Sequence, residues 1–294
     1  MNMDIFQDIE MDFDLEQVLK QLDEVIPPQP AVRFRIEAGD PGIFDSKIGG
    51  TPYFPRNMAF PCGKKGAFAD KPLSLLAQLN FEQLPQLPDF PTKGILQFFI
   101  AADSEYGTSY GSGDQSMQQE NFRVIYHENI ITDTAQLLSA DEIPSYTGEG
   151  CEGLPFRGAY RLTAQQPELM PLTSMDYRYP EAFAEAFNAC TDDPIESLYD
   201  LDEDIIEPLY NSYDDNAPKA AIGGYPHFTQ NDPRKANDVL AACDTVLFES
   251  DSLRDDAQGI DIMWGDLGIG VFLISRSDLK ARNFSRVLYH FDCG

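Results

Sequence analysis

The chain has 294 residues, of which 43% are hydrophobic and 12% aromatic, enough apolar side chains for the core of one large domain or two modest ones. Its 49 acidic and 21 basic residues give a formal net charge of −28. This charge repels nucleic-acid phosphates and anionic membrane surfaces, which excludes both as direct partners, and it favours a basic protein or a cation. Solubility alone is the alternative explanation.

The sequence predicts a cytoplasmic protein with reduced thiols. Residues 1–16 are acidic, whereas a secretory leader needs a positively charged start and an apolar run. No stretch approaches the ~18 consecutive apolar residues of a membrane-spanning helix. The five cysteines are odd in number, widely spaced and without a Cys-x-x-Cys motif, which disfavours a zinc site or a redox pair.

The chain opens with a predicted amphipathic helix and a strand. Asp14 and Gln17 form a capping-box pattern ahead of an apolar stripe, and two prolines end the helix at 27–28. The preceding stretch 4–12 is predicted to be either frayed or another helical turn. Alternating apolar residues then predict a strand over 31–37.

Four predicted strands follow along the chain, and then two helical stretches. Short apolar runs between turn residues predict strands over 73–81, 94–101, 122–127 and 160–163. Pro180 opens a predicted helix over 180–189, and the helical period continues over 194–213. Between 175 and 216 the only basic residue is Arg178, a bias that is typical of the solvated face of helices.

An internal repeat relates the two ends of the chain. Residues 221–228 (AIGGYPHF) repeat residues 47–54 (KIGGTPYF) position by position. Fifty residues after the isoleucine of each motif stand FFI at 98–100 and FLI at 272–274, and RVIYH at 123–127 is later matched by RVLYH at 286–290. Matches in the same order predict a diverged duplication.

The predicted fold class is α+β, with two antiparallel or mixed β units that pack about a pseudo-two-fold axis and are covered by helices. An acidic helical segment with its leading strand, 1–38, precedes a duplicated domain over 39–294. Within that domain, copy one covers about 39–165, a helical insertion about 176–216 and copy two about 217–294. A polar cleft between the copies is the expected ligand site.

No catalytic residue, cofactor or metal is assigned, because no hydrolase, zincin, dinucleotide or phosphate-loop motif occurs. The candidate ligand-binding residues come from the two glycine turns, from polar positions in apolar strands and from acidic loops of the second copy. They are Lys47, Gly49, Gly50, Gln78, Gly223, Gly224, His227, Glu249, Asp251, Trp264 and Asp266.

Each group of candidates has a structural alternative. Paired glycines let backbone amides approach a ligand, but a tight turn that leads into proline-fixed extended chain explains them better. Gln78 and Gln97 interrupt apolar strands, and Glu249 takes the place of Gln78 in copy two. If these polar side chains are buried, each needs a hydrogen-bonding neighbour or a ligand. The alternative is that they lie on a face of the strand that is exposed to solvent. Lys47 corresponds to Ala221 in the repeat. Because only one copy carries a lysine here, Lys47 is a candidate site residue.

The acids of the second copy form a further cluster, with Trp264 beside them as a possible aromatic wall or a core residue. They are Glu249, Asp251, Asp255, Asp256, Asp261 and Asp266. Their spacing does not match an EF-hand loop, so solvated loop acids are the favoured interpretation over a cation site. His127 and His290 end strands that the repeat pairs, which favours structural roles for both.

The motifs together resemble the YwqG-like proteins, bacterial proteins classed as a domain of unknown function. The resemblance runs from about Gly39 to the C-terminus and is carried by several short runs: KIGG-x-P at 47–52, LAQLNF at 76–81, LPDFP at 87–91, GILQFF at 94–99, IGGYP at 222–226, DPR at 232–234 and MWGD at 263–266. It implies a cytoplasmic α+β protein with a duplicated core and no established activity. Relatives are encoded beside secreted polymorphic toxins, which implies an immunity-type role.

Two functions from different classes are therefore expected. The first is a non-catalytic interaction module that binds a basic protein, supported by the charge and by the absence of catalytic motifs. The alternative is a small-molecule or metal-binding protein or enzyme, with its site in the cleft between the copies.

Overall fold

The computed structural model describes residues 11–109, 113–214 and 217–294, which form one large antiparallel sheet, a two-stranded ribbon and a group of helices. The sheet strands are β1 (Gln29–Ala38), β2 (Lys47–Gly49), β3 (Ser74–Asn80), β4 (Ile95–Ile100), β5 (Phe122–His127), β6 (Ala159–Ala164), β7 (Glu168–Met170), β8 (Ala220–Gly223), β9 (Thr245–Asp251), β12 (Ile269–Ile274) and β13 (Val287–Asp292). The ribbon pairs β10 (Leu253–Asp255) with β11 (Ile260–Ile262). The α-helices are α1 (Leu15–Val25), α2 (Tyr179–Asn188), α3 (Glu203–Asp214), α4 (Asp238–Ala241) and α5 (Arg276–Lys280).

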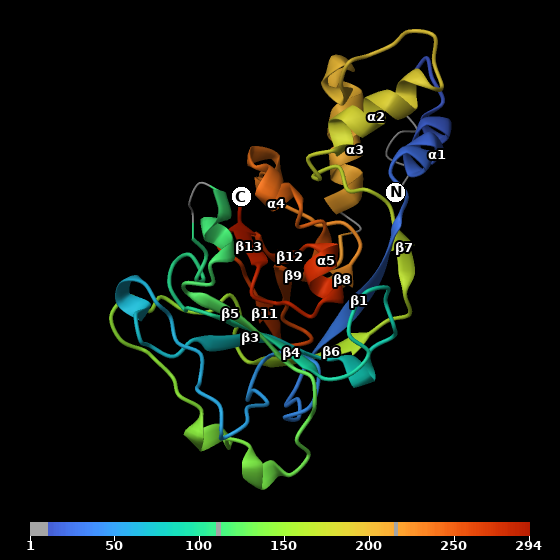
Figure 1. Ribbon diagram of the computed structural model, residues 1–294. Helices are drawn as coiled ribbons and strands as arrows, with labels where there is room; N and C mark the ends of the chain where they lie inside the picture. The colour runs from blue at the N-terminus through green and yellow to red at the C-terminus, as the bar shows by residue number, and fades with distance from the viewer. Residues whose placement is uncertain (1–10, 110–112, 215–216) are drawn as a thin grey trace.

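The sheet runs in the order β13-β12-β9-β8-β1-β6-β2-β3-β4-β5, with β7 also paired to β1. It curls into a nearly barrel-like shape, seen in Figure 1 as strands that surround a common interior. Opposite ends of the sheet meet inside it, because the ring of Phe98 on β4 lies 5.2 Å from that of Phe248 on β9 and 4.8 Å from that of Phe272 on β12. The α+β class predicted from the sequence is therefore confirmed.

Two runs of four strands flank the central pair β1 and β6. In one run Phe98 lies opposite Ala77, and the register then shifts past Leu76; in the other Phe272 lies opposite Phe248, and the register shifts past Leu247. Both runs thus carry a bulge at the same place relative to the paired phenylalanine.

The last strand of each run is aligned differently from the expectation. Val124 lies opposite Phe98. The sequence match pairs Val124 with Val287, but the residue opposite Phe272 is Tyr289, two positions further along the strand. His127 ends β5, but His290 lies two residues before the end of β13. A shift of two residues keeps each side chain on the same face of its strand, which is why the sequence pattern could not reveal it.

The helices agree with those predicted from the sequence, with one exception. Asp14 caps α1 by accepting a hydrogen bond from the Gln17 amide (3.1 Å), as the capping pattern predicts. The continuous helix predicted over 194–213 is wrong, because a 3-10 turn at Leu198–Asp200 precedes α3 and Leu201 between them is extended. The prediction for residues 4–12 falls almost wholly outside the described part of the chain.

The helices α1, α2 and α3 form a unit with its own core, and we call it the helical unit. Figure 1 shows these helices gathered beyond one end of the sheet. Their buried residues pack with one another and with Tyr225, separately from the aromatic core inside the sheet. Specific contacts between this unit and the sheet therefore decide how the two parts are joined.

Both Ile-Gly-Gly turns need glycine for steric reasons. Gly49 (φ 66°) and Gly223 (φ 73°) are left-handed, and a Cβ on either would lie far inside contact distance of its surroundings. At Gly223 the added atom would be 2.4 Å from the Pro30 carbonyl oxygen, and at Gly49 2.7 Å from that of Gly158. The turns are consequently fixed by backbone packing.

Gly223→Ala is expected to lower the free energy of unfolding by about 2 kcal/mol or more, because a left-handed alanine is strained and its Cβ meets backbone. Gly39→Ala is the control, since nothing lies within 4 Å of its added Cβ and its φ is ordinary. Urea unfolding should place the control within about 0.5 kcal/mol of the wild type. Equal effects of the two substitutions would contradict this account of the turn.

Candidate functional site

The structure places the two glycine turns on separate parts of the sheet. Gly49 pairs with Ala159 on β6, and Gly223 pairs with Ala31 on β1, so these two central strands lie between the turns. The amide of Gly224 donates to the Pro30 carbonyl (3.1 Å). This geometry favours the tight-turn interpretation of both motifs.

Lys47 is completely buried, and its side chain stabilises the loop around it. Its Nζ donates to the carbonyl oxygens of Gly42 (2.8 Å) and Thr51 (2.5 Å), which closes the loop on itself. Burial lowers the pKa of Lys47 to about 8, and the negative charges of Asp45 and Asp40 offset only part of that effect. Its hydrogen bonds explain the conspicuous lysine without a ligand.

Gln78 and Gln97 are both fully buried and bind protein groups. Gln78 Nε2 donates to the carbonyls of Ile43 and Asp45 (both 2.9 Å), while its Oε1 accepts from the Tyr53 amide and from Gln97 Nε2 (both 2.9 Å). These four bonds are all that a glutamine side chain can make. The network of Gln78, Gln97 and His127 is thus an internal feature of the sheet.

His127 completes this network through a hydrogen bond between its Nε2 and Gln97 Oε1 (2.9 Å). Burial lowers the pKa of the imidazole to about 4.

In the second run of strands a titratable pair replaces this amide network. Glu249 is 1% exposed; its Oε2 accepts from the His227 amide (3.2 Å) and its Oε1 lies 3.1 Å from His227 Nδ1. The Tyr53 amide contacts Gln78 in the same way in the first run. The structure therefore brings the predicted candidates His227 and Glu249 together as a buried pair.

The remaining candidates make other contacts and do not gather into a metal site among the described residues. Asp251 forms an ion pair with exposed Lys219. Trp264 is fully buried against Tyr106 and Phe291, so it is a core residue, and Asp266 lies in the exposed turn that follows it. Within the described ranges, no three His, Cys, Asp or Glu side chains converge as metal ligands.

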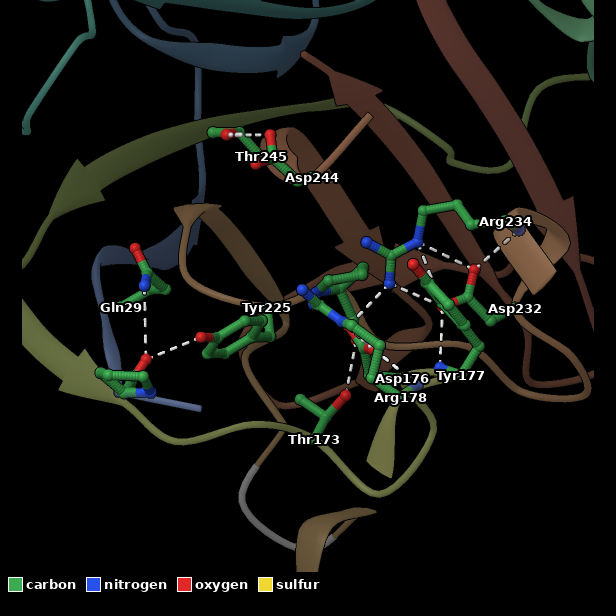
Figure 2. Close-up of polar contacts among 12 residues, drawn as sticks. Gln29, Thr173, Asp176, Tyr177, Arg178, Tyr225, Asp232, Arg234, Asp244 and Thr245 are labelled. Atoms are coloured by element: carbon green, nitrogen blue, oxygen red, sulfur yellow. Dashed lines mark hydrogen bonds and ion pairs between the residues drawn. The ribbon is translucent and has the colours of Figure 1, made fainter. Parts of the chain in front are cut away.

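A buried charge network that the sequence interpretation did not find joins the helical unit to the second run of strands (Figure 2). Arg234 Nη2 donates to Asp232 Oδ2 (2.6 Å) and to Asp176 Oδ2 (2.7 Å), and all three side chains are at most 2% exposed. Arg178 donates to Asp176 through Nε (2.7 Å) and Nη2 (2.6 Å). We call these four residues the Arg234 network.

The Arg234 network keeps the carboxylate of Asp176 charged. Burial by itself would raise the pKa of Asp176, but hydrogen bonds from Arg178 and the charge of Arg234 outweigh burial and hold that pKa below its usual value. The guanidinium of Arg234 lies 5.3 Å from the Tyr177 ring and 5.9 Å from the Phe228 ring. Only the Asp-Pro-Arg motif at 232–234 signalled the network in the sequence.

The outer surface of the helical unit carries unbalanced negative charge. Ten exposed carboxylates of this region form no ion pair with any described residue: Glu181, Glu185, Asp192, Asp193, Glu196, Asp200, Asp202, Glu203, Asp204 and Glu207. We call this surface the acidic face. The single arginine of the region is already held by Asp176, so the acidic face attracts cations from outside.

A mostly polar groove lies between the residues that precede α1 and those that follow α2, beside part of the acidic face. It has a volume of about 560 Å³, and Phe13 and Phe187, which meet edge to face at 4.9 Å, form part of its lining. Asp12, Asp14, Asp192 and Asp193 line the same groove. Phe187 is buried and Phe13 is half-buried, so the groove offers a partner mainly negative charge, which suits a basic segment of another protein.

A family model described as a domain of unknown function (DUF1963) matches residues 46–293. This match confirms the domain of unknown function predicted from the motifs, whereas the YwqG-like name stays a prediction. No curated protein shows significant similarity to the chain. In the described ranges, every helix is too short or too polar to cross a bilayer.

Asp176→Asn is expected to lower the free energy of unfolding by about 3–5 kcal/mol, because it leaves Arg234 as a partly unpaired buried charge. Asp251→Asn removes the same charge from an ion pair whose lysine is 43% exposed, and should change stability by less than about 1 kcal/mol. Urea midpoints of the two variants measure the difference. A loss at Asp176 as small as that at Asp251 would show that the Arg234 network contributes little.

The depressed pKa of His127 predicts lower stability in mild acid. The unfolded chain binds a proton near pH 6.5 and the folded chain only near pH 4, so stability is lost as pH falls through this window, by roughly 3 kcal/mol in total. His127→Gln should flatten the dependence of unfolding free energy on pH between these values, relative to the wild type. Parallel pH curves for the two proteins would refute the prediction.

Proposed function

Because the chain belongs to the DUF1963 family, whose domain has no known function, we propose its role from its own surface: it is a non-catalytic module that binds a basic protein through the acidic face. The groove at the start of α1 and the end of α2 is the observation that carries this proposal. It gathers four carboxylates in one hollow beside the half-buried ring of Phe13, and this concentration of charge in a concave site is what distinguishes a docking surface from acidity for solubility alone.

The charge of the acidic face favours association with a basic partner in two ways. Ten neighbouring carboxylates without internal counter-charges repel one another, and a cationic partner relieves that repulsion. The net charge of −28 also draws a basic protein toward the chain from a distance and speeds the encounter. Both effects weaken as salt screens the charges.

The resemblance to YwqG-like proteins favours one specific form of this proposal, an immunity-type role. In that role the acidic face covers a basic toxin or enzyme. A cytoplasmic location belongs to the same proposal and is supported by five cysteines that form no disulfide.

We also propose that the two runs of strands descend from one duplicated unit. Three features support this: the same strand order outward from the central pair, the same bulge after a paired phenylalanine, and the same contact of a backbone amide with the side chain at 78 or 249. The helical unit would then be the addition that gave one chain its binding surface.

A pull-down from lysate of the source cell tests the binding proposal with charge-reversed baits. Asp192→Lys with Asp193→Lys alters the groove, whereas Asp255→Lys with Asp256→Lys makes the same charge change at the turn of the β10–β11 ribbon, where Asp255 is half-buried and Asp256 exposed. Wild-type and control baits should retain one basic protein at low salt and release it at high salt. The groove variant should lose that protein by about tenfold.

Two outcomes would contradict the proposal. Recovery of no specific protein by any bait would remove the interaction itself. Equal losses from the groove and control baits would show that only total charge matters and that the groove is not the docking surface.

A further inference from the structure

A second hollow lies where the second run of strands meets the segment that precedes α2, apart from the groove of the acidic face. Its volume is about 310 Å³, and its lining includes His227, Lys219, Asp251, Met175, Phe228 and Leu267. We call it the His227 pocket. It combines polar groups with apolar walls, as binding sites for small molecules do.

His227 supplies the pocket with an unused polar atom. The residue is 8% exposed, and Nδ1 faces the carboxylate of Glu249. When Nδ1 donates this hydrogen bond to the carboxylate of Glu249, Nε2 of the neutral ring is the acceptor nitrogen. Nε2 makes no hydrogen bond with any residue that the structure describes, and His227 lines the pocket, so this nitrogen is open to a ligand there.

The mouth of the pocket is built from a strained turn. Leu267 has a left-handed backbone (φ 55°) and is 68% exposed, an unfavourable conformation and environment for a leucine. Ser252 holds this turn by donating to the Gly268 carbonyl (2.8 Å) and accepting from the Trp264 amide (2.9 Å). The leucine is thereby fixed as a wall over the pocket, where a ligand would cover it.

The charges around the pocket favour a cation. Asp251 lines the pocket and is paired with Lys219, and the carboxylate of Glu249 lies against His227, so two carboxylates accompany one ammonium. The net charge of −28 further disfavours an anionic ligand.

We propose that the His227 pocket binds a small organic amine. Its ammonium group donates to His227 Nε2 and is stabilised by the charge of Glu249, while its apolar body packs against Phe228 and Leu267. This inference concerns a site and a ligand class separate from the binding of a basic protein.

The first run of strands supplies the test variant. Gln78 there accepts from the Tyr53 amide (2.9 Å), as Glu249 accepts from the His227 amide. Glu249→Gln therefore keeps a contact that this fold already makes with glutamine, and removes only the charge. Circular dichroism and thermal unfolding verify that the variant is folded.

Three probes are compared: benzylamine, benzyl alcohol and benzoate. Each carries its polar group one carbon away from a benzene ring, and they differ in the charge and the hydrogen-bond donors of that group. Titration of each is followed by the imidazole ¹H–¹⁵N signals, which are resolvable because the chain has 3 histidines. Benzylamine should shift the Nε2 signal of His227 and leave that of His127 in place. Its affinity should exceed that of the alcohol by about tenfold and should fall by about tenfold in Glu249→Gln, in which the affinity of the alcohol is unchanged.

Several results would overturn the proposal. These are the absence of any His227 shift with benzylamine at tens of millimolar, alcohol or benzoate binding as tightly as the amine, or an amine affinity that Glu249→Gln leaves unchanged. Binding of a partner protein in the pull-down does not bear on this result, because the pull-down tests the groove and the titration tests the His227 pocket.

Discussion

The buried pairing of Arg234 with Asp176 and Asp232 is the interaction on which the arrangement of this protein depends (Figure 2). The helical unit has its own apolar core, so packing alone does not fix it to the sheet. Asp176 lies just ahead of α2, whereas Asp232 and Arg234 follow the second Gly-Gly turn. A charge pair at this depth tolerates little displacement, because a separated buried ion is strongly disfavoured.

The same network connects the two surfaces to which functions are assigned. On one side it holds α2, which carries Glu181 and Glu185 of the acidic face and leads into the residues that line the groove. On the other side Met175 precedes Asp176 and Phe228 packs near Arg234, and both residues line the His227 pocket. The proposed docking surface and the proposed small-molecule pocket are therefore both linked to one buried arginine.

Local patterns in the sequence predicted most of the elements but not how they meet. The α1 cap, the strands at 122–127 and the glycine turns follow from short-range chemistry, and the structure contains them. The Gln78 network and the Arg234 network join residues that are far apart in the chain, and no periodicity encodes such pairs. His227 and Glu249 were found as candidates because the repeat aligned them with Tyr53 and Gln78.

Native-state hydrogen exchange of an Arg234→Met variant tests the central role of this arginine most directly. The account predicts that the amides of α1, α2 and α3 become exposed together through a partial opening, while β4 and β12 exchange only on global unfolding. Unchanged protection of the helices, or equal acceleration in helices and sheet, would show that the arginine does not join the helical unit to the sheet.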